Sequence, residues 1–183
     1  MLAKDEKQSD RSFAEIRGQI LIACESGDFQ RALSLIEQFS ALFPEKGDTF
    51  AIWRVSVLAV SNHSFEAVQA LENAIEKGFW WPVSALRGEP DLASLQGEPR
   101  FEACVQICDR RARLAQQAAR PERRVLLPET KPNSAGYPLL VILHGRGGKV
   151  DDFIDLWQPA LRYGWIVAML GSSQASGYGS LSW

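Results

Sequence analysis

Residues 138–148, PLLVILHGRGG, decide the fold of the last third of the chain. The apolar run at 138–143 is bounded by turn residues, a pattern typical of a strand buried on both faces of a parallel sheet. It leads directly into a glycine-rich loop at 144–148. Asp151 and Asp152 then open a helix that Gly164 ends, and a second apolar strand follows at 165–170. This strand–helix–strand order predicts a parallel sheet.

The sequence on either side of this unit sets its limits. Residues 125–127 predict a further strand, and residues 129–136 are a loop rich in proline, asparagine, serine and glycine. The segment 171–183 is rich in glycine and serine, which also predicts a loop. Both apolar strands need cover on two faces, and one helix can cover only one of them.

The first two thirds of the chain show helical periodicity, with apolar residues three and four apart. Ser12 and Glu15 fit a capping box, Gly27 ends the first helix, Asp28 caps the second, and Pro44 closes it.

Two further long helices follow in the same region. Asp48 is expected to cap a third helix that runs to about residue 61, and a fourth helix ends near Gly78. Residues 82–99 read as short helical turns. A last apolar stripe marks a final helix, with Phe101, Cys104, Val105, Cys108 and Ala112.

The two helical pairs are related by an offset of 35 residues, which aligns Ala32 with Ala67. Residues 27–44, GDFQRALSLIEQFSALFP, resemble the second half of a tetratricopeptide repeat, whose period is about 34 residues. The resemblance implies an array of helices that can hold a peptide or protein partner. A generic array of helical hairpins is the alternative. Pro121 marks the expected boundary, which gives a helical domain at 1–120 and a second domain at 121–183.

Composition excludes several functional classes. The net charge is −2 and the isoelectric point is near 5.8, so no basic field is present to bind nucleic acid. The polar start of the chain is unlike a secretory signal, and the longest apolar run, 139–143, is too short for a membrane span. Three cysteines make a disulfide framework improbable. The expected setting is cytoplasmic.

The loop at 144–148 does not fit the common phosphate-binding patterns. Leu143 stands where a P-loop needs its first glycine, and Val150 stands where GxGxxG needs its third. The interpretation that remains is an oxyanion hole, in which backbone N–H groups stabilise the negative charge that develops on a carbonyl oxygen.

In this setting, YPLLVILHG followed by GWIVA, the segment 123–183 resembles the start of an α/β-hydrolase. It is most similar to the phospholipase/carboxylesterase and dienelactone-hydrolase-like groups. The resemblance implies a small ester substrate and no cofactor. It also implies a role for each loop residue. His144 is structural and holds the loop, and the backbone N–H of Arg146, the residue after His144-Gly145, donates to the oxyanion. Gly147 and Gly148 shape the turn, and the residues at the substrate rim are Ser172, Ser173 and Gln174.

The catalytic triad of that family has no counterpart in the sequence. None of the serines after the loop stands in GxSxG, and the chain's two histidines are His63, in the helical region, and His144. The 61 residues from Arg123 also fall short of the roughly 200 that such a domain needs.

Two hypotheses follow. In the first, the chain is the N-terminal portion of a serine carboxylic-ester hydrolase and is inactive alone. In the second, it is a tetratricopeptide-like binding module with a nonfunctional hydrolase remnant. The fold class is therefore α followed by α/β, a helical-repeat domain before an incomplete hydrolase sheet. No metal site is expected: Cys104 and Cys108 are four residues apart, but burial as free thiols accounts for them better.

Overall fold

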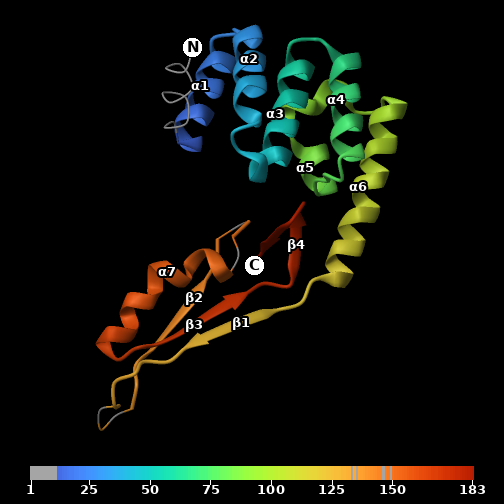
Figure 1. Cartoon of the computed structure of the whole chain (residues 1–183). Coiled ribbons are helices and arrows are strands. Elements are labelled where there is room, and N and C mark those ends of the chain that lie inside the picture. The colour runs from blue at the N-terminus through green and yellow to red at the C-terminus, as the bar shows by residue number, and fades with distance from the viewer. Residues whose placement is uncertain (1–11, 133, 135, 146, 149) are drawn as a thin grey trace. The chain divides into compact units, whose positions relative to one another are not determined.

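A computed structural model describes residues 12–183 apart from 133, 135, 146 and 149 (Figure 1). The chain divides into two compact units, of which the first ends at Cys108 and the second runs from Asp109 to Trp183. The division falls inside one long helix, α6 (Pro99–Ala118). Pro121 lies between that helix and the first strand, so a boundary there stays a prediction. Each unit is described by itself.

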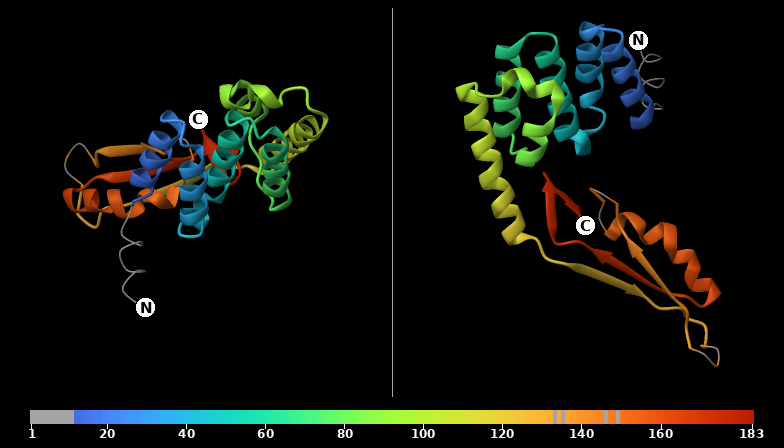
Figure 2. Two further views of the ribbon diagram at one scale, coloured as in Figure 1. Left: turned by 90° about the horizontal axis from the view of Figure 1, so that it is seen from above. Right: turned by 180° about the vertical axis from the view of Figure 1, so that it is seen from behind.

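The first unit is helical throughout its described length, as the periodicity predicts. Its four principal helices follow one another and pack side by side, which Figures 1 and 2 both show. Two short helical segments then lead to α6, which confirms the short helical turns predicted at 82–99. The elements before α6 are α1 (Phe13–Glu25), α2 (Phe29–Ser40), η1 (Pro44–Lys46), α3 (Gly47–Val60), α4 (Ser64–Glu76), α5 (Val83–Gly88) and η2 (Pro90–Leu95).

Two of the three predicted helix caps are confirmed. The Ser12 side chain accepts the backbone N–H of Glu15 at 3.3 Å, and the Glu15 carboxylate accepts that of Ser12 at 2.9 Å. Asp28 caps α2 by accepting the N–H of Arg31 at 3.1 Å. The prediction for Asp48 is wrong: η1 ends at Lys46, which takes the N-cap position, so α3 begins at Gly47, two residues earlier than expected. Asp48 lies in the first turn of α3, where its negative charge interacts favourably with the helix dipole and stabilises the helix.

The offset of 35 residues recurs in the turns between paired helices. Gly27, between α1 and α2, has a φ of 75°, and Asn62, between α3 and α4, has a φ of 64°. Asparagine tolerates this left-handed conformation better than most side chains do, so both turns end their helices in the same way. The equivalent small residues Ala32 and Ala67 are fully buried. The sequence repeat is therefore also a repeat of helical hairpins.

A three-stranded sheet forms the centre of the second unit, in the order β1-β3-β2. Strand β2 (Leu139–Leu143) runs parallel to β3 (Ile166–Gly171), which confirms the predicted parallel pair. Strand β1 (Glu122–Leu126) pairs with the other edge of β3 in the antiparallel direction.

The connection between β2 and β3 is less regular than the single helix predicted. It consists of η3 (Val150–Phe153), one α-helical turn, α7 (Ile154–Trp157), and η4 (Gln158–Tyr163). Pro159 lacks the N–H that a continuing α-helix requires, so the chain tightens into 3-10 geometry there. Gly164 ends the segment at a φ of 76°, as predicted.

The predicted loop after β3 is instead a β-hairpin. Strands β4 (Gln174–Gly177) and β5 (Ser180–Ser182) pair in the antiparallel direction around Tyr178 and Gly179. Gly179 has a φ of 60°, a left-handed conformation that glycine adopts without strain. The glycine and serine content of the segment concealed the short strands.

One face of the sheet is covered and the other is not. Ile142, Val167 and Met169 are buried against the helical connection, together with Val150. The side chains that point the other way from β2 are about half exposed: Leu139, Val141 and Leu143 retain 57%, 50% and 54% of their accessible surface. One helical connection covers one face, as expected. No helix among the described residues is long and apolar enough to cross a bilayer.

Candidate functional site

The glycine-rich loop begins at His144, at the carboxyl end of β2, where the imidazole ring is almost fully buried. Its Nδ1 lies 2.8 Å from the carbonyl oxygen of Gly145 and its Nε2 lies 3.0 Å from the backbone nitrogen of Ser172. A carbonyl only accepts and an amide N–H only donates, so Nδ1 carries the proton and Nε2 accepts. Both ring nitrogens of His144 are therefore engaged in hydrogen bonds.

Ser172 extends this network from the end of β3 to the hairpin. Its side chain is 2% exposed, and its hydroxyl donates to the carbonyl oxygen of Ser182. The same hydroxyl oxygen accepts the backbone N–H of Gln174 at 3.0 Å. The end of β2, the end of β3 and the hairpin are thus joined through two buried polar side chains.

Gly147 connects the loop to the hairpin. Its N–H donates to the carbonyl oxygen of Leu181 at 2.9 Å, and its φ is 79°. A Cβ atom at Gly147 would lie 3.1 Å from the hydroxyl oxygen of Ser180, so the position favours glycine both by conformation and by space. The N–H of Gly148 donates to the carbonyl oxygen of Gly145 at 3.0 Å and closes the turn.

The residues singled out from the sequence have different places in this arrangement. His144, Gly145, Gly147, Gly148 and Ser172 belong to one hydrogen-bonded network. Gln174 opens β4, and Ser173 accepts a hydrogen bond from the side chain of Gln116 through its carbonyl oxygen, at 2.8 Å. Arg146 lies outside the described residues, so the expected role of its N–H stays a prediction.

The sequence did not predict two contacts that hold the loop and the hairpin in place. Gln116, on the second half of α6, also accepts the N–H of Ala175 at 3.0 Å, so its amide bonds the backbone before and after Gln174. The ring of Trp183 lies 5.5 Å from that of His144. Each contact joins residues far apart in the chain, and no motif within a single sequence marks such pairs.

The geometry limits the chemistry that these groups can perform. Both nitrogens of His144 are occupied, so the ring cannot take a proton from a nucleophile without breaking the network. The Ser172 hydroxyl is engaged as donor and as acceptor. The backbone N–H of Gly147 is engaged as well, by the carbonyl oxygen of Leu181. Together these hydrogen bonds fix the loop against the hairpin.

No metal centre is formed by the part of the chain that the structure describes, where no three histidine, cysteine, aspartate or glutamate side chains cluster. Cys104 and Cys108 are buried on α6, and neither is part of a disulfide. Burial raises the pKa of the Cys104 thiol to about 12. A thiol with such a pKa is a poor metal ligand and a poor nucleophile.

Comparison with known proteins relates the chain to hydrolases through its helical part. The family described as "A/B hydrolase-like, N-terminal domain" matches residues 21–116, from within α1 to near the end of α6. The match therefore covers the helices and ends before the sheet begins. No curated protein matches the chain.

The crystal structure of an uncharacterized protein from Bacillus cereus has a similar fold, with a TM-score of 0.51 at 21% sequence identity. The match covers 94% of this chain and 55% of the other. The present chain thus spans about half the length of the solved protein, and the shared fold extends over both the helices and the sheet.

Proposed function

The chain belongs to the A/B hydrolase-like, N-terminal domain family, and on this premise we propose that it is the N-terminal portion of a serine carboxylic-ester hydrolase. One observation carries the proposal. The glycine-rich loop leaves the carboxyl end of the parallel strand β2 and is fixed there, with the N–H of Gly147 bonded to the carbonyl oxygen of Leu181 at 2.9 Å. A loop fixed in this way can hold a neighbouring backbone N–H in place for an ester carbonyl oxygen, whose negative charge grows as the tetrahedral intermediate forms.

The position of the loop supports this function. In open α/β sheets, ligands bind outside the carboxyl ends of the parallel strands, and the loop leaves β2 at that end. His144 ties the loop to the end of β3 through Ser172. Preorganised donors of this kind stabilise a transition state because they need no rearrangement during the reaction.

Each loop residue has a role in the proposal. The N–H of Arg146 donates to the oxyanion, Gly147 and Gly148 shape the turn, and His144 is a positioning residue. Ser172, Ser173 and Gln174 form the rim on the β3 side. The serine, acid and base of the triad lie outside these 183 residues, in keeping with the greater length of the Bacillus cereus protein. The substrate is a small ester of the kind hydrolysed by esterases and by phospholipase/carboxylesterases.

Turnover of p-nitrophenyl acetate tests the proposal in two samples. The purified 183-residue chain should give no turnover that a fluorophosphonate inhibitor abolishes. The native protein, purified from its source cell and identified by its peptides, should give inhibitor-sensitive turnover. Inhibitor-sensitive turnover by the isolated chain would place a reactive serine inside it and contradict the division of roles. Absence of turnover in the native protein would contradict the esterase function.

A tetratricopeptide-like binding module is the second candidate. It is favoured by the repeated hairpins, whose turns at Gly27 and Asn62 share one backbone conformation and whose Ala32 and Ala67 are equally buried. Arrays of helical hairpins present extended surfaces to partners. We also place the protein in the reducing cytoplasm, because none of its three cysteines, all within the described residues, forms a disulfide.

A further inference from the structure

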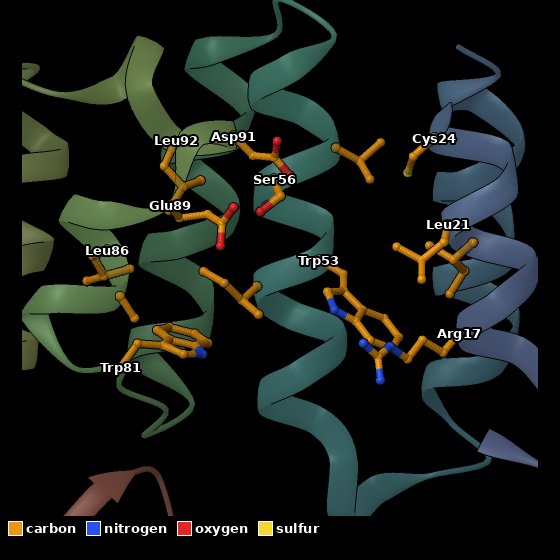
Figure 3. A pocket seen from close by; sticks show the side chains of 14 residues that line it. Arg17, Leu21, Cys24, Trp53, Ser56, Trp81, Leu86, Glu89, Asp91 and Leu92 are labelled. Carbon is orange, nitrogen blue, oxygen red and sulfur yellow. The ribbon is translucent and has the colours of Figure 1, made fainter. Parts of the chain in front are cut away.

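The helical unit contains a pocket of about 340 Å³ that the hydrolase proposal does not use (Figure 3). Side chains of α1, α3, α5 and η2 line it, so the pocket extends across three successive pairs of helical segments. Its apolar floor is made by residues that are buried in the fold, namely Ile20, Val57, Leu86 and Leu92.

Two tryptophans form walls of this pocket, and both are held in place. Trp53 stacks on Phe13 with ring centroids 5.6 Å apart, and meets Phe50 edge to face at 5.4 Å. Trp81 is 8% exposed, so only part of its indole faces the pocket. Indole rings fixed in this way lose little entropy when a ligand binds. They offer an apolar contact and, for a cation, a favourable π face.

Charged groups of opposite sign border different parts of the pocket. Glu89 and Asp91 come from the segment where α5 passes into η2, and Arg17 comes from α1, beside Trp53 in Figure 3. Neither carboxylate makes an ion pair or a side-chain hydrogen bond within the described part of the chain. The two carboxylates are therefore available to a cationic group of a ligand.

The negative potential at this end of the pocket reaches a neighbouring side chain. Cys24 lines the pocket, and burial raises the pKa of its thiol, with further contributions from the charges of Asp91 and Glu25. Burial disfavours a charge of either sign, but the smaller contributions from Asp91 and Glu25 have the sign that favours a cation.

Together these features define an occupant. A volume of about 340 Å³ lies at the lower end of the range for ligand pockets, and it suits one or two side chains better than a folded surface. We propose that the pocket binds a peptide segment of a partner protein in which apolar side chains stand next to lysine or arginine. The apolar side chains lie between Trp53 and Trp81, and the basic group lies at Glu89 and Asp91. Arg17 orients the segment, because it attracts an acidic group and repels a second cation.

Fluorescence polarisation with three labelled peptides tests this proposal on the full chain. The probe is GSEGLLKKSG, which places an acidic residue, two apolar residues and two basic residues in the expected order. In GSKGLLEESG the charges are exchanged, and in GSEGSSKKSG serines replace the leucines. We expect the probe to bind at least five-fold more tightly than either comparison peptide at low ionic strength.

Protein variants locate the binding. The double variant Glu89→Gln/Asp91→Asn should weaken binding of the probe by five-fold or more while circular dichroism stays unchanged. The matched control is Glu66→Gln/Glu76→Gln, which removes the same charge from exposed positions on α4, outside the pocket. It should leave the affinity within two-fold of the original value. Trp81→Ala should also weaken binding, but Trp81 is buried and its loss can disturb the fold.

Three results would overturn the proposal: no binding of the probe at millimolar concentration, equal binding of all three peptides, or equal weakening by both double variants. The proposal does not depend on ester hydrolysis, since its residues lie in the helical unit and its readout is affinity. An experiment that contradicts the peptide-binding proposal therefore leaves the hydrolase proposal unaffected, and the reverse also holds.

Discussion

The imidazole of His144 accepts the backbone N–H of Ser172 at 3.0 Å, and so joins the carboxyl ends of two neighbouring parallel strands. The other ring nitrogen donates to the carbonyl oxygen of Gly145, at the start of the glycine-rich loop. Histidine is a common catalytic base in enzymes, but His144 has a structural role here. Its two hydrogen bonds fix the glycine-rich loop to the end of the sheet.

Removing the ring of His144 should destabilise the second unit. In His144→Ala the buried N–H of Ser172 loses its acceptor, which costs about 1–3 kcal/mol in free energy of unfolding. Urea unfolding measures the loss, and hydrogen exchange at the Ser172 amide should become faster. His63→Ala is the control, because His63 is exposed at the start of α4 and its loss should cost about 0.5 kcal/mol or less. Unchanged exchange at Ser172 in His144→Ala would contradict the assignment.

Two glycines of the loop should differ in their tolerance of alanine. Gly147→Ala forces a side chain into a left-handed conformation and toward Ser180, at a cost of about 1 kcal/mol or more. At Gly145 an added Cβ meets open space. In the native protein we expect Gly147→Ala to lower kcat for p-nitrophenyl acetate by about ten-fold or more, since misaligned oxyanion donors are costly. Gly145→Ala should change kcat by much less. Equal effects would argue against a shaped oxyanion loop.

Acid should weaken the helical unit partly through Glu102. Its carboxylate accepts from Arg87 and from the backbone N–H of Gly97, which lowers its pKa from 4.5 to about 2. A depressed pKa in the folded state stabilises the fold above pH 4.5, and this stabilisation disappears as the pH falls toward 2. Urea midpoints measured between pH 5 and pH 2 should fall less steeply in Glu102→Gln than in the original chain.

The control for this pH dependence is Glu66→Gln, at an exposed position on α4 that has no ion pair within the described residues. It should keep the steep fall of the original chain. If Glu102→Gln and the original chain follow parallel curves, the Arg87–Glu102 contact does not persist in solution.

The cysteines should differ in their reaction with iodoacetamide. The pKa of Cys104 is raised to about 12, chiefly by burial, so it should react more slowly than the partly exposed Cys24. The pKa of Cys24 is raised by burial and then by Asp91. Asp91→Asn should therefore increase the rate at Cys24 at pH 8, by about two- to three-fold. Mass spectrometry of the labelled peptides separates the sites. An unchanged rate at Cys24 would show that the charge of Asp91 does not affect the pKa of this thiol.

Local signals in the sequence predicted much of the fold. The capping box of Ser12 and Glu15 and the parallel pair of β2 and β3 depend on residues close in sequence or on continuous apolar runs. The predicted helix before Gly164 is α-helical over one turn, and Pro159, which has no N–H to donate, accounts for the 3-10 geometry of its last part. Asp48 was expected to be a cap, but the preceding turn decides where α3 begins.

The candidate site was predicted only in its local part. The loop at 144–148 stands out by its glycines and its place after a strand. Its partners do not: the Gly147–Leu181 and Gln116–Ser173 contacts use backbone carbonyls, which carry no sequence signal. The hairpin that presents Leu181 was missed because serine and glycine are depleted in strands.

Intact mass and fluorophosphonate labelling of the native protein test the central claim most directly. Peptides from residues 12–183 identify the protein in its source cell, and one labelled sample gives both its mass and its reactive serine. The account predicts a protein of about twice 20.4 kDa, with the label on a serine outside the present sequence. A native protein of 20.4 kDa, or a larger one that hydrolyses esters without a labelled serine, would contradict the account.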